Sequence, residues 1–118
     1  MKKVYYLSTC DTCKRILNEL DLPSNFSLQN IKTDAMTKAQ IDEMAKLAGS
    51  YEALFSKRAR LYKSLELKDK NLKEPDFKHY LLDHYTFLKR PVIINGDQIF
   101  VGNSKKTIAE AKTAIHES

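Results

Sequence analysis

Alternating and periodic apolar positions in the first 32 residues predict a strand, a helix and a second strand. Residues 2–7 form a β-branched and aromatic run that is typical of a strand. Residues 10–22 place isoleucine and leucine at helical spacing, and Pro23 ends that helix. Residues 25–31 alternate apolar and polar side chains, so a second strand is expected there. A crossover of this length favours parallel strands with a right-handed connection.

The middle of the chain, at about residues 37–88, is predicted to be helical. Thr37 and Gln40 have the spacing of a capping box, and Gly49 is a natural end for the helix that they begin. Further helices are expected at residues 51–55, 61–67 and 74–85. We see no linker or repeat around this segment, so it reads as an insertion rather than a separate domain.

The last third of the chain returns to strands. Residues 90–102 contain two apolar runs joined by Asn95-Gly96, a pair that strongly favours a β-hairpin. Ser104 then caps a final helix, whose buried stripe is predicted to contain Ile108, Ala111 and Ile115. The predicted order is therefore β-α-β, several helices, and β-β-α.

Composition narrows the class of protein. Of 118 residues, 42% are hydrophobic and 30% charged, which is typical of one folded domain, here expected to be a monomer covering residues 1–118. No apolar run has membrane-spanning length, and the N-terminal apolar stretch is too short for a secretory signal, so we expect a cytoplasmic protein without a membrane partner. The net charge of +5 favours anionic partners without choosing among oxyanions, acidic proteins and nucleic acid.

The two cysteines of the chain, Cys10 and Cys13, stand three positions apart at the start of the first predicted helix. In a reducing compartment such a pair is more often redox-active or metal-binding than a structural disulfide. Core packing is the plainer alternative. A zinc site would need two further ligands, and the sequence contains no second cysteine pair and no well-spaced histidines, so no metal is expected.

The position of the pair gives each cysteine a different expected role. Backbone N–H groups and the helix dipole favour a thiolate on Cys10, and Lys14 and Arg15 add nearby cations. Asp11 opposes that thiolate while favouring the helix start, so the acidity of Cys10 should be moderate. Cys13 lies deeper in the helix, within bridging distance. We therefore expect Cys10 to attack and Cys13 to resolve the mixed disulfide.

A β-α-β unit followed by a β-β-α unit, with a cysteine pair beginning the first helix, is the layout of a thioredoxin-like fold. The prediction is an α/β protein with a mixed four-stranded sheet and a helical insertion at about residues 37–88. In that fold a cis-proline before the third strand faces the active cysteine, and Pro91 has that place. Arg90 would then direct a cation toward Cys10, although a proline at a strand start and a solvated strand-end charge are the simpler interpretations.

Several segments carry a family resemblance: "YLSTCDTCKRIL", "SKRARLYKSLEL", "LLDHYTFLKRPVIINGDQIFVG" and the final helix. In this order they resemble the glutaredoxin-dependent arsenate reductases, including their Spx branch of transcriptional regulators. Cys10 matches the family's nucleophilic cysteine. Cys13 stands where the reductases carry serine and where the Spx branch carries the second cysteine of a CxxC switch.

The oxyanion-binding residues of that family are matched unevenly. Arg90 matches one of three arginines that hold the oxyanion, whereas the other two positions fall at Ser56 and near Val101. Tyr6 replaces the histidine four residues before the nucleophile, and Arg58 resembles an arginine of the Spx branch. An arsenate ester normally needs several convergent cations, so the dithiol chemistry is better matched than the oxyanion site.

Two functions follow from the resemblance. The first is a cytoplasmic thiol oxidoreductase similar to arsenate reductase, with no bound cofactor and with glutathione and glutaredoxin, or thioredoxin, as reductant. Its substrate would be a small oxyanion or a thiol compound, and its other partner a redox protein. The residues expected to bind the substrate or anion are Thr12, Arg58, Arg90 and Pro91.

The second is an Spx-like regulator that binds the RNA polymerase α subunit under the control of a Cys10–Cys13 disulfide. The basic segment at residues 57–73 would suit either function, and it is equally typical of a solvated surface. No motif for direct nucleic-acid binding is present.

Overall fold

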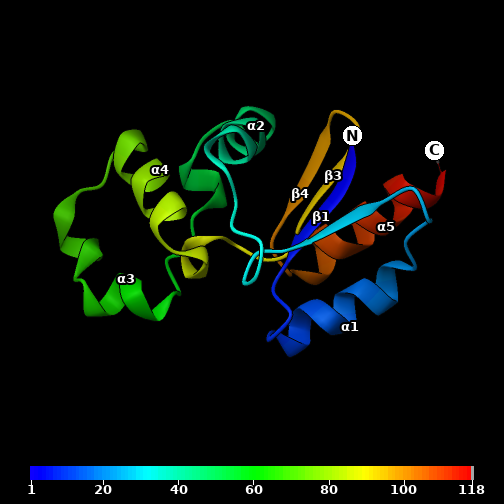
Figure 1. Ribbon diagram of the computed structural model, residues 1–118, viewed down its shortest axis with the longest axis horizontal. Helices are drawn as coiled ribbons and strands as arrows, with labels where there is room; N and C mark the ends of the chain where they lie inside the picture. The colour runs from blue at the N-terminus through cyan, green and yellow to red at the C-terminus, as the bar shows by residue number, and fades with distance from the viewer. Residues whose placement is uncertain (118) are drawn as a thin grey trace. The chain divides into compact units, whose positions relative to one another are not determined.

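The computed structural model describes residues 1–117, which form two compact units (Figure 1). The first unit contains Met1–Ala35 and the chain from Arg90 onward. The second unit is Met36–Lys89, which agrees closely with the insertion predicted at about residues 37–88. No helix in the described part of the chain is both long enough and apolar enough to cross a membrane.

The first unit is built on a mixed four-stranded sheet. Its strands are β1 (Lys2–Tyr6), β2 (Ser27–Asn30), β3 (Val92–Asn95) and β4 (Gln98–Val101). The strand order is β2-β1-β3-β4, with β1 parallel to β2 and antiparallel to β3, and with β3 antiparallel to β4. This sheet, with a helix after β1 and another after β4, confirms the thioredoxin-like α/β fold.

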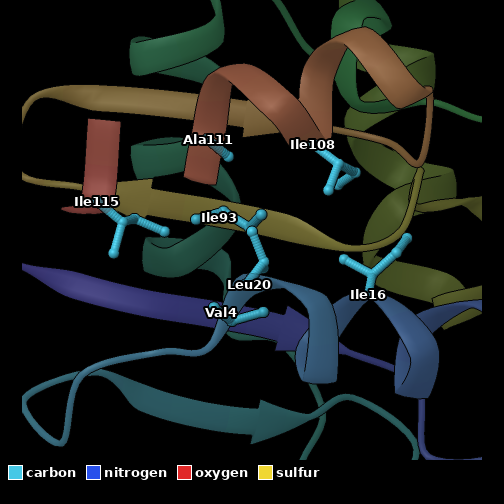
Figure 2. Close-up of a cluster of buried hydrophobic side chains, with 7 residues drawn as sticks. All are labelled: Val4, Ile16, Leu20, Ile93, Ile108, Ala111 and Ile115. Atoms are coloured by element: carbon cyan, nitrogen blue, oxygen red, sulfur yellow. The ribbon is translucent and has the colours of Figure 1, made fainter. Parts of the chain in front are cut away.

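Two helices, α1 (Asp11–Leu20) and α5 (Lys105–Glu117), contact each other and pack on the sheet (Figure 1). Figure 2 shows the core between them, where Val4 of β1 and Ile93 of β3 meet the apolar faces of both helices. The helices contribute Ile16, Leu20, Ile108, Ala111 and Ile115. Burial of each large side chain in this cluster contributes about 1.5–3 kcal/mol to stability. This packing fixes the axis of α1.

The C-terminal end of α1 is fixed by contacts of its own, in addition to the packing of its buried face. Asp21 follows the helix in the left-handed region, with a φ of 49°. The ring Nε2 of His116, near the end of α5, lies 2.7 Å from the carbonyl oxygen of Leu20 and donates a hydrogen bond to it. Since the last carbonyls of a helix have no partner within the helix, this contact joins α5 to the end of α1.

The second unit is helical throughout. Its elements are α2 (Lys38–Ala48), η1 (Glu52–Leu54), α3 (Arg60–Ser64), η2 (Leu67–Lys70), α4 (Glu74–Asp83) and η3 (Tyr85–Phe87). The capping box is confirmed, because Thr37 Oγ1 accepts from the Gln40 backbone and Gln40 Oε1 accepts from the Thr37 backbone. Gly49 ends α2 with a φ of 99°, as expected for a left-handed cap.

An aromatic cluster forms the centre of the second unit. The ring of Phe55 stacks on that of Phe87 at 5.1 Å between centroids and packs at an angle on Phe77 at 4.9 Å. A β-bridge between Phe55 and Leu88 fixes the chain on either side of it. This single bridge therefore connects the segment before α3 to the segment after α4, although neither segment belongs to the sheet.

The hairpin loop was predicted one residue too early. Asn95 is a buried strand residue paired with Gln98, so the two loop residues are Gly96 and Asp97. Gly96 has the positive φ, at 67°, and its N–H donates to the carbonyl of Met1. The pairing of Asn95 with Lys2 extends β3 to this point, which the local turn signal could not indicate.

Replacing Leu20 with alanine should lower the free energy of unfolding by about 2–5 kcal/mol, because it opens a cavity in the core under α1. Leu28, which is 53% exposed on β2, provides the matched control, and Leu28→Ala should cost less than about 0.5 kcal/mol. Urea unfolding followed by circular dichroism measures both. Equal losses for the two variants would contradict this description of the core.

Candidate active site

The first turn of α1 is set by a tight turn after β1. The Cys10 N–H donates to the carbonyl of Leu7 at 3.1 Å, and the Lys14 N–H donates to the carbonyl of Cys10 at 3.2 Å. Cys10 is therefore the N-cap residue, with extended φ and ψ and no side-chain cap. Cys13 follows within the first turn. The sequence placed the pair at this helix start, and the structure agrees.

Cys10 is half-buried, and its thiol has a pKa below the ordinary value of 9.0. Burial alone would raise that pKa. The backbone N–H and the thiol of Cys13, the positive charge of Arg90 and the backbone N–H of Thr12 together outweigh it. Unpaired N–H groups at a helix start stabilise a negative charge, so the Cys10 thiol is more acidic than an ordinary cysteine.

Cys13 behaves in the opposite way. Its side chain is fully buried, and burial, together with the neighbouring Cys10, raises the pKa of the thiol to about 11. The backbone N–H of Leu7 and the charge of Arg90 act against that rise without cancelling it. The pair therefore combines a Cys10 thiol whose pKa is lowered with a Cys13 thiol that stays protonated at neutral pH.

Arg90 and Pro91 begin the second half of the first unit. The peptide bond between them is cis, Pro91 is buried, and the Pro91 carbonyl accepts from the N–H of Gly102 at 3.0 Å. Arg90 is half-buried just before β3, and its charge lowers the pKa of both Cys10 and Cys13. The structure thus brings Arg90 to the cysteine pair.

The other cations predicted around the pair are placed differently. Lys14 and Arg15 are exposed on α1. Among the described residues, the groups with the strongest effect on the Cys10 pKa are Cys13, Arg90 and Thr12 rather than these two cations. Arg58 is an exposed residue of the second unit, just before α3. Thr12 contributes its backbone N–H to Cys10.

The family positions that lack arginine are occupied by uncharged side chains. Val101, at the end of β4, is half-buried and pairs with Val92. Ser56, at the other such position, lies in the second unit. Tyr6, which stands where the resemblance implies a histidine, is half-buried at the end of β1. In the described part of the chain, no group of three or more His, Cys, Asp or Glu residues could hold a metal ion.

Two contacts near the cysteines were missed by sequence reasoning. One is the Leu7 N–H beside Cys13, and the other is the side chain of Asn30, whose Oδ1 accepts from the Ser8 N–H at 3.2 Å. A main-chain donor has no sequence signature. The Asn30 contact joins segments that are far apart in the chain, and an asparagine after a strand signals at most a turn.

Replacing Arg90 with alanine should slow the alkylation of Cys10 at neutral pH by about three- to tenfold, because losing an adjacent cation raises the thiol pKa. Arg15→Ala is the matched control and should change the rate much less. Iodoacetamide kinetics in a Cys13→Ser background measure Cys10 alone. An Arg15→Ala effect as large as that of Arg90→Ala would contradict this assignment.

Comparison with known proteins places this site in a family. The ArsC family matches residues 5–111. The arsenate reductase of Haemophilus influenzae is 27% identical over 92 residues, which make up 78% of this chain and 72% of that protein. A solved structure of a protein related to the ArsC family, from Bacteroides fragilis, is similar with a TM-score of 0.76 and 20% identity over 93% of this chain and 96% of that one.

An arsenate reductase from Vibrio cholerae is also similar in structure, with a TM-score of 0.69 and 19% identity over 98% of this chain and 97% of that one. At these identities the two structural similarities support the fold. The family match covers the cysteine pair, the Arg90–Pro91 bond, the end of β1 and all of β2, β3 and β4. The resemblance to the arsenate reductase family is thereby confirmed, and the chain belongs to the ArsC family.

Proposed function

We propose that this protein is a thiol oxidoreductase of the arsenate reductase type, with Cys10 as nucleophile and Cys13 as resolving thiol. The observation that carries the proposal is the placement of two thiols one turn apart at the N-terminus of α1, with Cys10 half-buried at the N-cap and Cys13 fully buried. Burial and the backbone N–H groups shift the pKa values of these thiols in opposite directions. A thiolate is the attacking nucleophile, whereas a protonated thiol does not react until it loses its proton. Membership of the ArsC family supports the same chemistry.

The proposed reaction balances as a two-electron exchange. The Cys10 thiolate attacks the central atom of an oxidised oxyanion and forms a bond from sulfur to that atom, while a bond from the central atom to one oxygen breaks and that oxygen leaves, with protons, as water. Cys13 then loses its proton and attacks the Cys10 sulfur, forming a disulfide, while the electron pair of the sulfur–substrate bond leaves with the reduced product. Two thiols give up two electrons and two protons, which is the amount that reduction of arsenate to arsenite requires.

A small oxyanion or a thiol compound is the proposed substrate class. Arg90 supplies a positive charge that acts on the Cys10 sulfur, and the Thr12 N–H stabilises charge on the same sulfur. We propose, on the fold resemblance, that the cis-Pro91 segment faces this sulfur. Arg58 is proposed as a second anion-binding cation on the family resemblance. Since Ser56 and Val101 are uncharged, this site offers fewer cations than the family pattern.

Regeneration requires an external reductant. No group in the proposed cycle reduces the Cys10–Cys13 disulfide, so a thiol from outside the chain must attack it. We propose glutathione with glutaredoxin, or thioredoxin, in this role, with the redox protein as a transient partner. The protein itself needs no bound cofactor for the chemistry described.

Arsenate-dependent oxidation of NADPH, coupled through glutathione, glutaredoxin and glutathione reductase, tests the proposal. Wild type should turn over, and Cys10→Ser should abolish turnover because the nucleophile is lost. Cys13→Ser should lose most of it; if that variant keeps the wild-type rate, an external thiol resolves the intermediate. Asn18→Ser, on the exposed face of α1, controls for a general effect of substitution in the helix.

A second candidate is an Spx-like regulator, favoured by the cysteine at position 13 and by the exposed basic side chains between Lys57 and Lys73. In this alternative the same disulfide acts as a switch for binding the RNA polymerase α subunit. Absence of arsenate turnover, together with oxidation-dependent capture of purified α subunit, would favour the regulator. Turnover that is lost in Cys10→Ser, without such capture, would favour the enzyme.

A further inference from the structure

The side chain of Asn30 connects two separate segments beside the cysteine pair. Asn30 is half-buried at the end of β2, and its Oδ1 accepts one hydrogen bond from the Ser8 N–H and one from the Lys32 N–H, each at 3.2 Å. Ser8 belongs to the turn that leads into α1, and Lys32 belongs to the turn after β2. One oxygen therefore holds the two turns together.

The backbone around Asn30 leaves its side chain little freedom. Asn30 pairs with Tyr6 in the parallel register, and the Ile31 N–H donates to the Tyr6 carbonyl at 2.9 Å. On the other side, the carbonyl of Asn30 accepts from the N–H groups of Thr33 and Asp34. With the main chain fixed before and after it, the amide is already directed at Ser8 when the strands pair.

The turn that Asn30 holds contacts both cysteines, Cys13 at its thiol and Cys10 at its backbone N–H. Ser8 lies between Leu7 and Cys10. The N–H of Leu7 stabilises charge on Cys13, and the carbonyl of Leu7 accepts a hydrogen bond from the Cys10 N–H. The N-cap of α1 has no side-chain cap bond of its own. The Asn30–Ser8 bond therefore supplies a side-chain contact that holds the turn in front of the helix.

We propose that Asn30 is a positioning residue for the dithiol, which holds the turn at Ser8 so that the Leu7 backbone and the α1 N-terminus face Cys10 and Cys13. The proposal rests on the thiol oxidoreductase function proposed above. Asn30 does not touch the reacting sulfurs in this role and acts through the backbone. Small displacements of reacting groups have large effects on rate, so a fixed turn matters to the chemistry.

The test uses Asn30→Ala and two companion variants. Asn30→Asp keeps an acceptor oxygen at the same place, and Asn95→Ala removes a buried amide from the opposite end of the sheet, where it contacts Gln98. Two readouts need no arsenate and no reductase: amide hydrogen exchange at Ser8 and Lys32, and the equilibrium of the Cys10–Cys13 disulfide with glutathione.

In Asn30→Ala, exchange at Ser8 and Lys32 should accelerate, and the disulfide equilibrium constant should change by about fivefold, which corresponds to one net hydrogen bond. Asn30→Asp should restore protection at both amides and most of the equilibrium constant. Asn95→Ala should lower the unfolding midpoint and leave both readouts at wild-type values. This set of results would support the positioning role.

If Asn30→Ala lowers the unfolding midpoint as Asn95→Ala does, while the disulfide equilibrium stays at its wild-type value, Asn30 is only structural and the proposal is overturned. Should Asn30→Ala fail to fold, unprotected Ser8 and Lys32 amides in folded Asn30→Asp would overturn it equally. Failure of the proposed function looks different. Wild type would then lack arsenate turnover, although the Asn30 variants still shift the disulfide equilibrium.

Discussion

The site depends on one electrostatic balance, between the burial that opposes a charge on Cys10 and the backbone N–H groups of α1 that favour it. Those N–H groups face the sulfur only because Cys10 is the N-cap residue of a helix whose axis is fixed by the core. Arg90 adds a charge from the other half of the sheet. If the first turn of α1 lost its alignment, the thiolate would lose its main compensation for burial.

The same geometry separates the roles of the two sulfurs. Cys10 lies at the edge of the helix and Cys13 faces the core, so one turn of α1 places a favoured thiolate against a protonated thiol. The pKa difference between the two thiols is not intrinsic to cysteine, since both have the same ordinary value of 9.0. The difference comes from burial and from the direction of backbone N–H groups.

Local patterns predicted most of the fold and the centre of the site. The capping box at Thr37, the helical spacing of Ile16 and Leu20, and the order of strands and helices along the chain all follow from short stretches of sequence, and all are found in the structure. The hairpin loop was misplaced because the pairing of Asn95 with Lys2, across the sheet, decides where β3 ends. A local turn motif contains no information about pairing between strands that are far apart in the sequence.

The electrostatic partners of the cysteines were harder to predict for the same reason. Proximity in sequence suggested Lys14 and Arg15, which are exposed on α1, whereas Arg90, expected only through the fold resemblance, adds its charge from the start of β3. The backbone donor at Leu7 and the amide of Asn30 reach the site only through the turn after β1 and the pairing of β2 with β1. Residue types alone do not encode these contacts.

A carbon-13 NMR titration of the two cysteine Cβ resonances in the reduced wild-type protein tests the central claim most directly. The account predicts that the Cys10 resonance shifts with a midpoint below the ordinary thiol value of 9.0, and that the Cys13 resonance shifts only as the pH approaches about 11. Two thiols that titrate together at the ordinary value would contradict it.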